Sequence, residues 1–259
     1  MSLPWYDATP GRGTPIVLLH AFPLSSAIFD RLLPDLDGSR VLRVDLPGLA
    51  RSAVPDEPPS VAVMADAVAA VLDDAGVGAG VVLGVSTGGY VALELAARHP
   101  DRVAALALGS TTTRVIAPDE PAERRALADR LDATGDLQPL VDGADAGLGG
   151  TAQREQPDLL PLLRSIVQDA DPRGVAWVAR AIAGRRDTGD VLRDLAVPVL
   201  LLFGAEDTET PPVRAEEMAA LRTGTTRTVV LPATGHLTAL ERPLQVAAEL
   251  LTLVADAER

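Results

Sequence analysis

The sequence of 259 residues predicts an α/β fold built on a mostly parallel sheet of about six strands. Short apolar runs alternate with stretches of helical periodicity, which is the order found in parallel sheets covered by helices on both faces. One strand-to-helix transition, at Gly84–Gly89, is abrupt and rich in glycine. A chain of this length can bury a large core, and α/β folds of this size are often one domain.

Six apolar runs bounded by turn residues are the predicted strands of this sheet. They are Pro15–His20, Arg40–Asp45, Gly80–Val85, Val103–Leu108, Val197–Phe203 and Thr226–Leu231.

Two helices of the sheet region have clear signals. Ser60 is a predicted N-cap, because apolar residues recur at helical spacing from Val61 to Leu72. Gly76 then stands where a glycine commonly ends a helix. The last predicted helix covers Pro243–Asp256 and carries its apolar residues on one side.

The alternation of strands and helices stops between Thr111 and Asp190, where no convincing strand is present. Helices are predicted near Glu120–Ala133, Asp158–Asp169 and Pro172–Ala183, and Asp-Pro is a good start for the third. The glycine-rich stretch Gly143–Gly150 lacks the strand and helix context of a phosphate loop, so we expect a flexible connection there.

Composition excludes several kinds of chemistry. Cysteine is absent, and all 23 basic residues are arginine, so thiolate and Schiff-base lysine mechanisms are impossible. With three histidines and no thiolates, we expect no metal site and no cofactor. A net charge of -13 gives no basic face for nucleic acid or for anionic membranes, so neither is an expected partner.

No targeting or spanning segment is apparent in the sequence. Residues 1–14 have neither the basic flank nor the apolar core of a signal peptide. No apolar run approaches the roughly 18 residues that a membrane helix needs. A cytoplasmic protein is therefore expected, and the sequence predicts no particular oligomeric state.

Ser86 is the candidate nucleophile, because it is the centre of a G-x-S-x-G pattern between a predicted strand and a predicted helix. Small residues on both sides let the backbone turn sharply and expose the hydroxyl beside a helix N-terminus. A serine needs a neighbouring base to become nucleophilic at neutral pH. The alternative is a serine in a glycine-rich turn without a catalytic role.

Candidates for the base and its orienting acid follow in the chain. Asp207 lies in the turn after an apolar strand, and His236 lies in a loop after the next one. Glu206, beside Asp207, and the nearby Glu209 are the competing acids, and Glu206 is the second choice. The other two histidines have structural explanations: His20 ends the first strand, and His99 ends a helix where a positive charge is favourable.

These segments resemble α/β-hydrolase-fold serine hydrolases over nearly the whole chain. Serine, acid and histidine follow in that family's order. Leu18–Pro23 resembles its oxyanion loop, and Asp45–Gly48 with Ser52 resembles its D-x-P-G-x-G-x-S turn. Gly235-His236 with Glu241 and Pro243 resembles its G-H-x-x-x-x-E-x-P ending.

The resemblance implies roles for particular residues. The family's G-x-x-D spacing from Gly204 selects Asp207 as the acid, and His20 braces the oxyanion loop. The backbone N–H groups of Phe22 and Thr87 would form the oxyanion hole. Two usual glycines are replaced, by Ala21 and Ala50, and we expect a slightly reshaped loop at Ala21 because alanine tolerates positive φ poorly.

It also implies a division of the chain. Residues 1–110 and 191–259 would form the α/β-hydrolase core, and residues 111–190 a helical cap inserted before the last two strands. An ordinary helical layer packed elsewhere is the alternative. The amino-terminal hairpin usual in the family is expected to be shortened or lost. Trp177 lies in the expected cap, either lining a substrate pocket or anchoring a helix.

The function implied is cofactor-independent hydrolysis of a small-molecule ester or lactone through an acyl-enzyme. The general likeness is to small bacterial esterases and enol-lactonase-like enzymes. His20–Ser25 and Ser86–Gly89 also resemble segments of cofactor-free haloperoxidases and perhydrolases, and C–C bond hydrolases share the motifs. A ligand-binding pseudoenzyme of the same fold is the alternative from another class.

Overall fold

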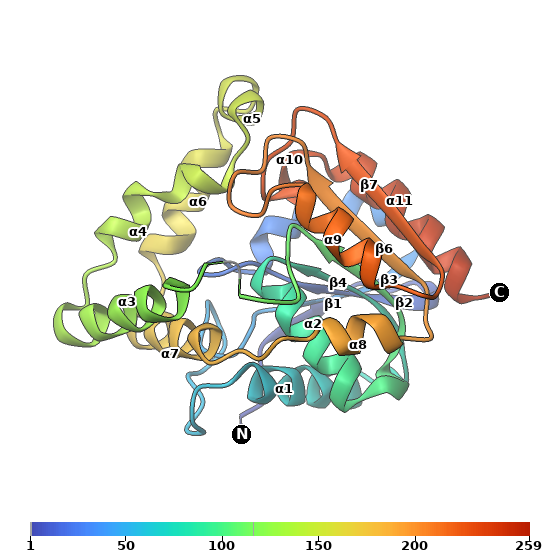
Figure 1. The fold of residues 1–259 in the computed structure, drawn as a ribbon, viewed down its shortest axis with the longest axis horizontal. Coiled ribbons are helices and arrows are strands. Elements are labelled where there is room, and N and C mark those ends of the chain that lie inside the picture. Colours follow the sequence, from blue (N-terminus) through green and yellow to red (C-terminus); the bar gives the residue numbers. More distant parts are fainter. Residues whose placement is uncertain (1, 116) are drawn as a thin grey trace.

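The computed structural model describes residues 2–115 and 117–259, and its centre is a mostly parallel sheet (Figure 1). Seven strands lie in the order β1-β3-β2-β4-β5-β6-β7, and only the β1–β3 pair is antiparallel among the described residues. Their bounds are Tyr6–Ala8, Arg12–Leu19, Ser39–Val44, Gly80–Val85, Val103–Gly109, Val199–Gly204 and Thr226–Leu231 for β1 to β7.

The predicted α/β fold is confirmed, and the expected strand number is corrected from about six to seven. The additional strand, β1, pairs Tyr6 with Val44 and Ala8 with Leu42 at the edge of the sheet. It has only three residues and includes an aspartate, so it lacks an apolar run that would mark it in the sequence. This single edge strand stands where the family's hairpin was expected to be shortened.

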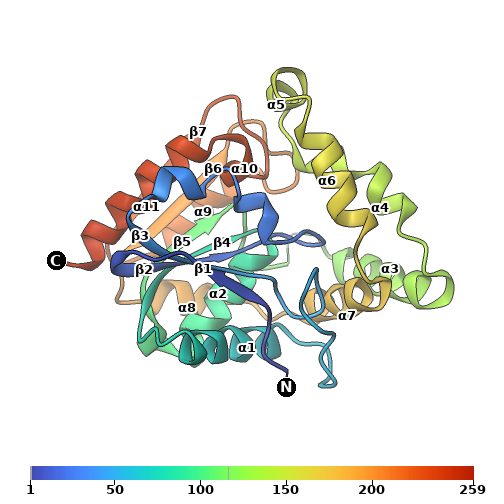
Figure 2. The same ribbon diagram turned by 180° about the vertical axis from the view of Figure 1, so that it is seen from behind.

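Helices cover both faces of the sheet (Figures 1 and 2). Val17 and Leu19 of β2 pack with α1, α2 and α9, whereas Ile16 and Leu18 pack with α11 on the other face. This division follows the two-residue period of a strand. The bounds are Val61–Asp74 for α1, Thr87–Arg98 for α2, Gly189–Asp194 for α8, Val213–Leu221 for α9, Thr238–Glu241 for α10 and Pro243–Ala257 for α11.

The predicted caps of α1 are confirmed. The Ser60 side chain accepts a hydrogen bond from the N–H of Ala62, as an N-cap does. Gly76 follows the helix with a φ of 64°, the left-handed conformation that favours glycine.

A second group of helices lies to one side of the sheet, beyond the carboxyl ends of its strands (Figure 1). Helix α3 packs against α7, and α4 packs against α6. The three predicted helices of this segment are confirmed as α3, α6 and α7. The bounds are Glu120–Thr134 for α3, Gln138–Asp142 for α4, Gly150–Glu155 for α5, Leu159–Gln168 for α6 and Pro172–Ala183 for α7.

Two details of this segment differ from the expectation. Gly143–Gly150 is a 3₁₀ turn at Ala144–Gly147 followed by the start of α5, and its Gly149 packs closely against the backbone at Gly235. The expected boundary at 190 falls inside α8, which packs against α2 and α9 of the sheet region. Met1 and Ile116, in the expected core and cap ranges, lie outside the described residues. None of the described helices is long and apolar enough to cross a membrane.

Candidate active site

Ser86 stands on a strained turn between β4 and α2. Its φ of 54° is uncommon for a residue other than glycine, and such strain often occurs at functional sites. A Cβ on Gly84 would lie 2.3 Å from the Gly88 carbonyl oxygen, and one on Gly88 would lie 2.2 Å from that of Leu19. Only glycine fits at either position, which explains the two glycines of the G-x-S-x-G pattern.

Neighbouring backbone holds this turn in place. The N–H of Ser86 donates to the carbonyl of Gly109 at 2.8 Å, and the Ser86 carbonyl accepts from the N–H of Gly89 at 2.8 Å. The hydroxyl of Thr111 donates to the same Ser86 carbonyl at 2.8 Å. The serine backbone is therefore fixed from β5 as well as from its own helix, which leaves the side chain at the carboxyl edge of the sheet.

The structure brings His236 and Asp207 together. Imidazole Nδ1 lies 3.0 Å from Oδ2 and 3.1 Å from Oδ1 of the carboxylate, and both residues are buried. The carboxylate Oδ1 also accepts from the N–H groups of Glu209 and Thr210, at 3.0 and 2.8 Å. Four contacts thus fix the acid, and the contact at Nδ1 leaves Nε2 of the imidazole for a second partner.

Glu206, the competing acid, is engaged elsewhere. Its two carboxylate oxygens accept from the N–H and the hydroxyl of Thr151, at 2.8 and 2.6 Å. These hydrogen bonds lower the pKa of the Glu206 carboxyl. Asp207, and not Glu206, is therefore the acid whose carboxylate contacts the imidazole of His236.

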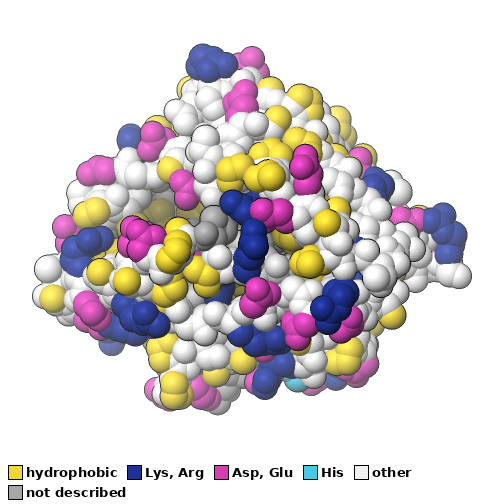
Figure 3. All heavy atoms as spheres, in the orientation of Figure 1, with side chains coloured by type: hydrophobic (Ala, Val, Ile, Leu, Met, Phe, Trp, Pro, Cys, Tyr) yellow, Lys and Arg dark blue, Asp and Glu magenta, His cyan; other side chains and the backbone are white. Residues whose placement is uncertain are grey.

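Ser86 and His236 line one cavity of about 170 Å³. No hydrogen bond joins their side chains in the part of the chain that the structure describes, and catalytic hydrogen bonds often tighten only in the substrate complex. The opposite wall comes from the second helix group and includes Leu140, Leu163 and Val167. Figure 3 shows a hollow beside α4 and α6 in which hydrophobic side chains are visible.

Both expected oxyanion donors also line this cavity. Phe22 follows β2, and Thr87 is the first residue of α2, directly after the serine. Ala21 does not take a positive φ, whereas Ala50 does, at 50°. Of the two alanines that replace family glycines, only the one in the D-x-P-G turn adopts a strained conformation.

His20 holds the oxyanion loop from beneath, as expected. It is fully buried, with Nδ1 2.9 Å from the carbonyl oxygen of Ala21 and Nε2 2.9 Å from the backbone nitrogen of Leu46. Since an N–H donates to Nε2, that nitrogen is unprotonated, and Nδ1 carries the hydrogen given to Ala21. Burial lowers the pKa of His20, which agrees with a neutral ring.

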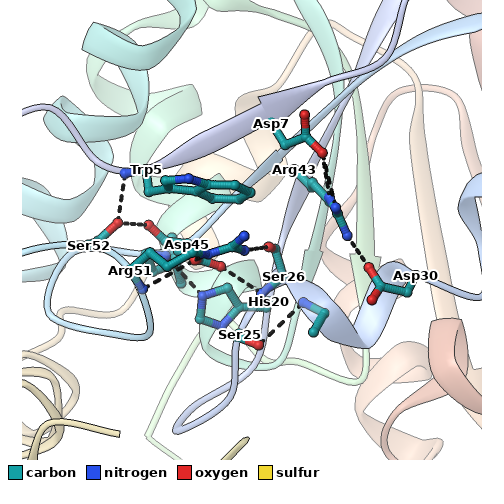
Figure 4. Close-up of polar contacts among 12 residues, drawn as sticks. Trp5, Asp7, His20, Ser25, Ser26, Asp30, Arg43, Asp45, Arg51 and Ser52 are labelled. Carbon is teal, nitrogen blue, oxygen red and sulfur yellow. Dashed lines mark hydrogen bonds and ion pairs between the residues drawn. The ribbon is translucent and has the colours of Figure 1, made fainter. Parts of the chain in front are cut away.

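A polar network next to His20 fixes the same loops (Figure 4). Asp45, fully buried, accepts from the N–H of Ser26 at 2.9 Å and from Nε of Arg51 at 2.6 Å. The Arg51 guanidinium lies 3.0 Å from the centre of the Trp5 ring. Burial raises the pKa of the Asp45 carboxyl, but the hydrogen bonds from Arg51 and Ser26 outweigh this and lower it.

Glu241 joins the histidine loop to the second helix group. Its Oε2 accepts from the N–H of Gly235 at 2.8 Å and from the N–H of Gly149 at 3.2 Å, in a buried position. Burial raises the pKa of this carboxyl, although both backbone donors oppose the change. The acid of the G-H-x-x-x-x-E-x-P ending therefore positions the residue just before His236.

Trp177 lies outside the residues that line the cavity. Its side chain is buried in the hydrophobic cluster of α1, α2 and α7, and its Nε1 donates to the carbonyl of Glu57 at 2.9 Å. The structure thus places it as an anchor between α7 and the loop before α1. Arg124 of α3 does line the cavity, and no pattern in the sequence indicates it.

No group of three or more His, Asp or Glu side chains that could hold a metal ion occurs within residues 2–115 and 117–259.

Comparison with known proteins identifies the family. Residues 14–243 match the family model described as alpha/beta hydrolase fold. The chain belongs to this family. It is 33% identical over 235 residues to a pimeloyl-[acyl-carrier protein] methyl ester esterase of Neisseria meningitidis serogroup A, covering 85% of this chain and 70% of that protein. A protein of the same name from Methylococcus capsulatus is 30% identical over 242 residues, covering 83% of this chain and 85% of that protein.

Solved structures agree. A thermophilic esterase from Thermogutta terrifontis has a TM-score of 0.92 and 31% identity, with 98% of this chain and 94% of that chain covered. The enol-lactonase of Burkholderia xenovorans shares the fold, with a TM-score of 0.87, 24% identity and 97% and 96% of the two chains covered. The protein is thus an α/β-hydrolase-fold carboxylic ester hydrolase.

Proposed function

We propose that Ser86, His236 and Asp207 act as a catalytic triad that hydrolyses a carboxylic ester or lactone through an acyl-enzyme. The observation that carries the proposal is the shared cavity: the serine on its strained turn and the imidazole paired with a buried carboxylate both line it. Nucleophile, base and orienting acid in this relation are the parts that acyl transfer requires.

The reaction follows from these roles. Ser86 Oγ attacks the ester carbonyl carbon while His236 Nε2 takes the hydroxyl proton. The carbonyl oxygen becomes an oxyanion, which the N–H groups of Phe22 and Thr87 stabilise. Collapse breaks the bond to the alcohol oxygen, which leaves with the proton from His236. Water, deprotonated by the same imidazole, then attacks the acyl-enzyme and releases the acid and Ser86.

Asp207 acts through His236 and is a positioning residue. Its carboxylate keeps the hydrogen on Nδ1, so that Nε2 is free to accept the serine proton, and it stabilises the imidazolium that forms.

The relatives' names suggest an ester of a small alcohol as substrate, and the fold likeness to an enol-lactonase keeps lactones within the proposal. A perhydrolase would form the same acyl-enzyme and transfer it to peroxide instead of water. The largely apolar wall of Leu140, Leu163 and Val167 suits an aliphatic acyl chain.

We also propose that residues 111–190 act as a cap that sets substrate range, with 1–110 and 191–259 as the catalytic core. The support is that this segment supplies one wall of the cavity, whereas Ser86 and His236 come from loops of the sheet.

Turnover of p-nitrophenyl butyrate tests the proposal. We expect hydrolysis by the wild type, almost none by Ser86→Ala, and attachment of a fluorophosphonate to Ser86 alone. Ser165→Ala, on an exposed position of α6, is the matched control and should keep both activity and labelling. A pseudoenzyme would neither turn over nor label, and labelling at another serine would also refute the proposal.

The acid is tested by two neighbouring variants. Asp207→Asn should cost about 10⁴ in kcat, the scale reported when a triad acid is lost. Glu206→Gln should leave kcat close to wild type, because its carboxylate binds Thr151 rather than the imidazole. The reverse result would move the acid by one residue.

A further inference from the structure

The active-site cavity carries two charged side chains besides the imidazole, among the described residues that line it. Arg124 comes from α3 of the proposed cap, and Glu209 comes from the loop that also carries Asp207. The remaining lining residues are mostly aliphatic or aromatic, and Leu140, Leu163 and Val167 belong to the wall opposite Ser86. A single cation in such a wall is a strong local determinant of which substrates bind, because charges interact more strongly where water is scarce.

Arg124 has no carboxylate partner among the described residues. Two other arginines of residues 111–190 do have one: Arg180 pairs with Asp129 at 2.7 Å, and Arg185 pairs with Glu120 at 2.8 Å. The Arg124 guanidinium instead lies over the ring of Phe22, 5.4 Å from its centre. Its side chain is half-buried, so its charge has lost part of its hydration without gaining an anion.

Arg124 lies where the active-site cavity meets a second groove. Arg124 and Leu140 line both the active-site cavity and a neighbouring groove on α3 and α4, whose other lining residues include Leu127 and Pro139 and the charged Glu120, Glu123 and Arg130. A chain bound in the active-site cavity is therefore in reach of walls that carry both Ser86 and the guanidinium. Phe22, whose ring the guanidinium faces, carries the proposed oxyanion donor on its backbone.

A carboxylate is an anion that the Arg124 guanidinium can bind. The planar guanidinium can donate two parallel hydrogen bonds to the two oxygens of a carboxylate. Glu209 also lines the cavity and repels the same anion, which leaves Arg124 as the attractive charge among the described residues that line it. A contact with the acyl part would act in both steps, because the alcohol leaves after the first step whereas the acyl chain stays bound through both.

We propose that Arg124 recognises a carboxylate at the far end of the substrate's acyl chain, so that half-esters of dicarboxylic acids, or lactones bearing a free carboxylate, are preferred. This inference rests on the proposed function. It adds a specificity-determining residue that takes no part in bond making or breaking.

A matched pair of substrates tests it. Mono-p-nitrophenyl adipate and p-nitrophenyl hexanoate share a leaving group and chain length, and differ in the terminal carboxylate. The quantity measured is the ratio of their kcat/KM values. In Arg124→Gln the ratio should fall at least about fivefold, mainly through KM of the adipate, because a binding contact is lost. Arg124→Lys should retain part of the preference, and Arg124→Glu should reverse it.

Arg125→Gln is the control, because this exposed neighbour on α3 does not line the cavity. The inference is overturned if the adipate-to-hexanoate ratio of kcat/KM falls by less than about fivefold in Arg124→Gln. It is also overturned if the ratio falls equally in Arg125→Gln. A preference that follows a carboxylate on the alcohol side, measured with a carboxy-substituted nitrophenyl butyrate, overturns it as well. The proposed function fails separately, if neither neutral ester nor half-ester is hydrolysed by wild type in a Ser86-dependent way.

Discussion

At the scale of single residues, the imidazole of His20 is held between the carbonyl of Ala21 and the N–H of Leu46, with no solvent contact. Protonation would place a second hydrogen on Nε2, facing the hydrogen of the Leu46 N–H. The ring would then lose one of its two hydrogen bonds while carrying a buried charge. The order of the oxyanion loop therefore depends on a histidine that remains neutral.

This gives a pH-dependent stability. Burial lowers the pKa of His20 from its ordinary 6.5, so the folded state binds fewer protons than the unfolded state below that pH. The contribution of His20 is complete above pH 6.5 and is lost as pH falls toward the lowered value. Unfolding free energies of wild type and His20→Gln, measured by denaturant titration at several pH values, should converge as pH falls below 6.5. A difference that stays constant or grows in acid would contradict this.

At the scale of elements, the turn between β4 and α2 joins a strand to a helix with almost no connecting chain. The close approach of Gly84 to the Gly88 carbonyl, and of Gly88 to that of Leu19, allows the helix to start directly behind the serine. Backbone atoms cannot move aside as a flexible side chain can, so a methyl group there must displace the strand or the helix.

Replacement of Gly84 by alanine should therefore lower the unfolding free energy by about 1–3 kcal/mol, as overpacking of a close contact does. Gly78→Ala is the matched control, because nothing lies within 4 Å of its added Cβ and its φ is not positive. That variant should stay within about 0.5 kcal/mol of wild type. Equal stability of the two variants, by thermal or denaturant unfolding, would show that the turn adjusts easily.

The elements with strong periodicity or caps were predictable, and the exceptions have physical reasons. Helix α7 begins and ends at the predicted residues, because Asp171-Pro172 starts it and Gly184 follows it. Strand β1 was missed because its three residues contain no apolar run, and its partner strand β3 is distant in the sequence. Asp207 and His236 were predictable from spacing, whereas Arg124 was not, since its place in the cavity depends on how α3 packs on α7.

At the scale of the whole molecule, the proposed cap is attached to the rest of the chain at two places on either side of the cavity. On one side, Glu206 and Glu241 bind the backbone of Thr151 and Gly149. On the other, a Cβ on Gly174 of α7 would lie 1.8 Å from the Gly48 carbonyl oxygen, so these backbones are in close contact. Such long-range contacts are invisible to local sequence patterns.

Trp177 belongs to the second attachment, three residues after Gly174 on α7. Its buried indole packs with the cluster beneath α7 and donates to the Glu57 carbonyl of the loop before α1. Truncation to alanine removes this contact and leaves a cavity, which typically costs about 3–5 kcal/mol for a tryptophan. Trp177→Ala should therefore lower the melting temperature substantially. It should leave the relative kcat/KM for acetate, butyrate and octanoate p-nitrophenyl esters unchanged among folded molecules, because the residue does not line the cavity.

Leu163→Ala supplies the comparison, since this buried side chain of α6 lines the cavity wall. Truncating this side chain should enlarge the cavity and shift the ester profile toward longer acyl chains, because a longer chain can then make apolar contacts within it. If Trp177→Ala instead shifts the profile as much as Leu163→Ala does, at equal folded fraction, the second attachment also shapes the pocket. In that case the contacts of Glu206 and Glu241 would hold the cap next to His236, whereas the contacts of Gly174 and Trp177 would set the width of the cavity.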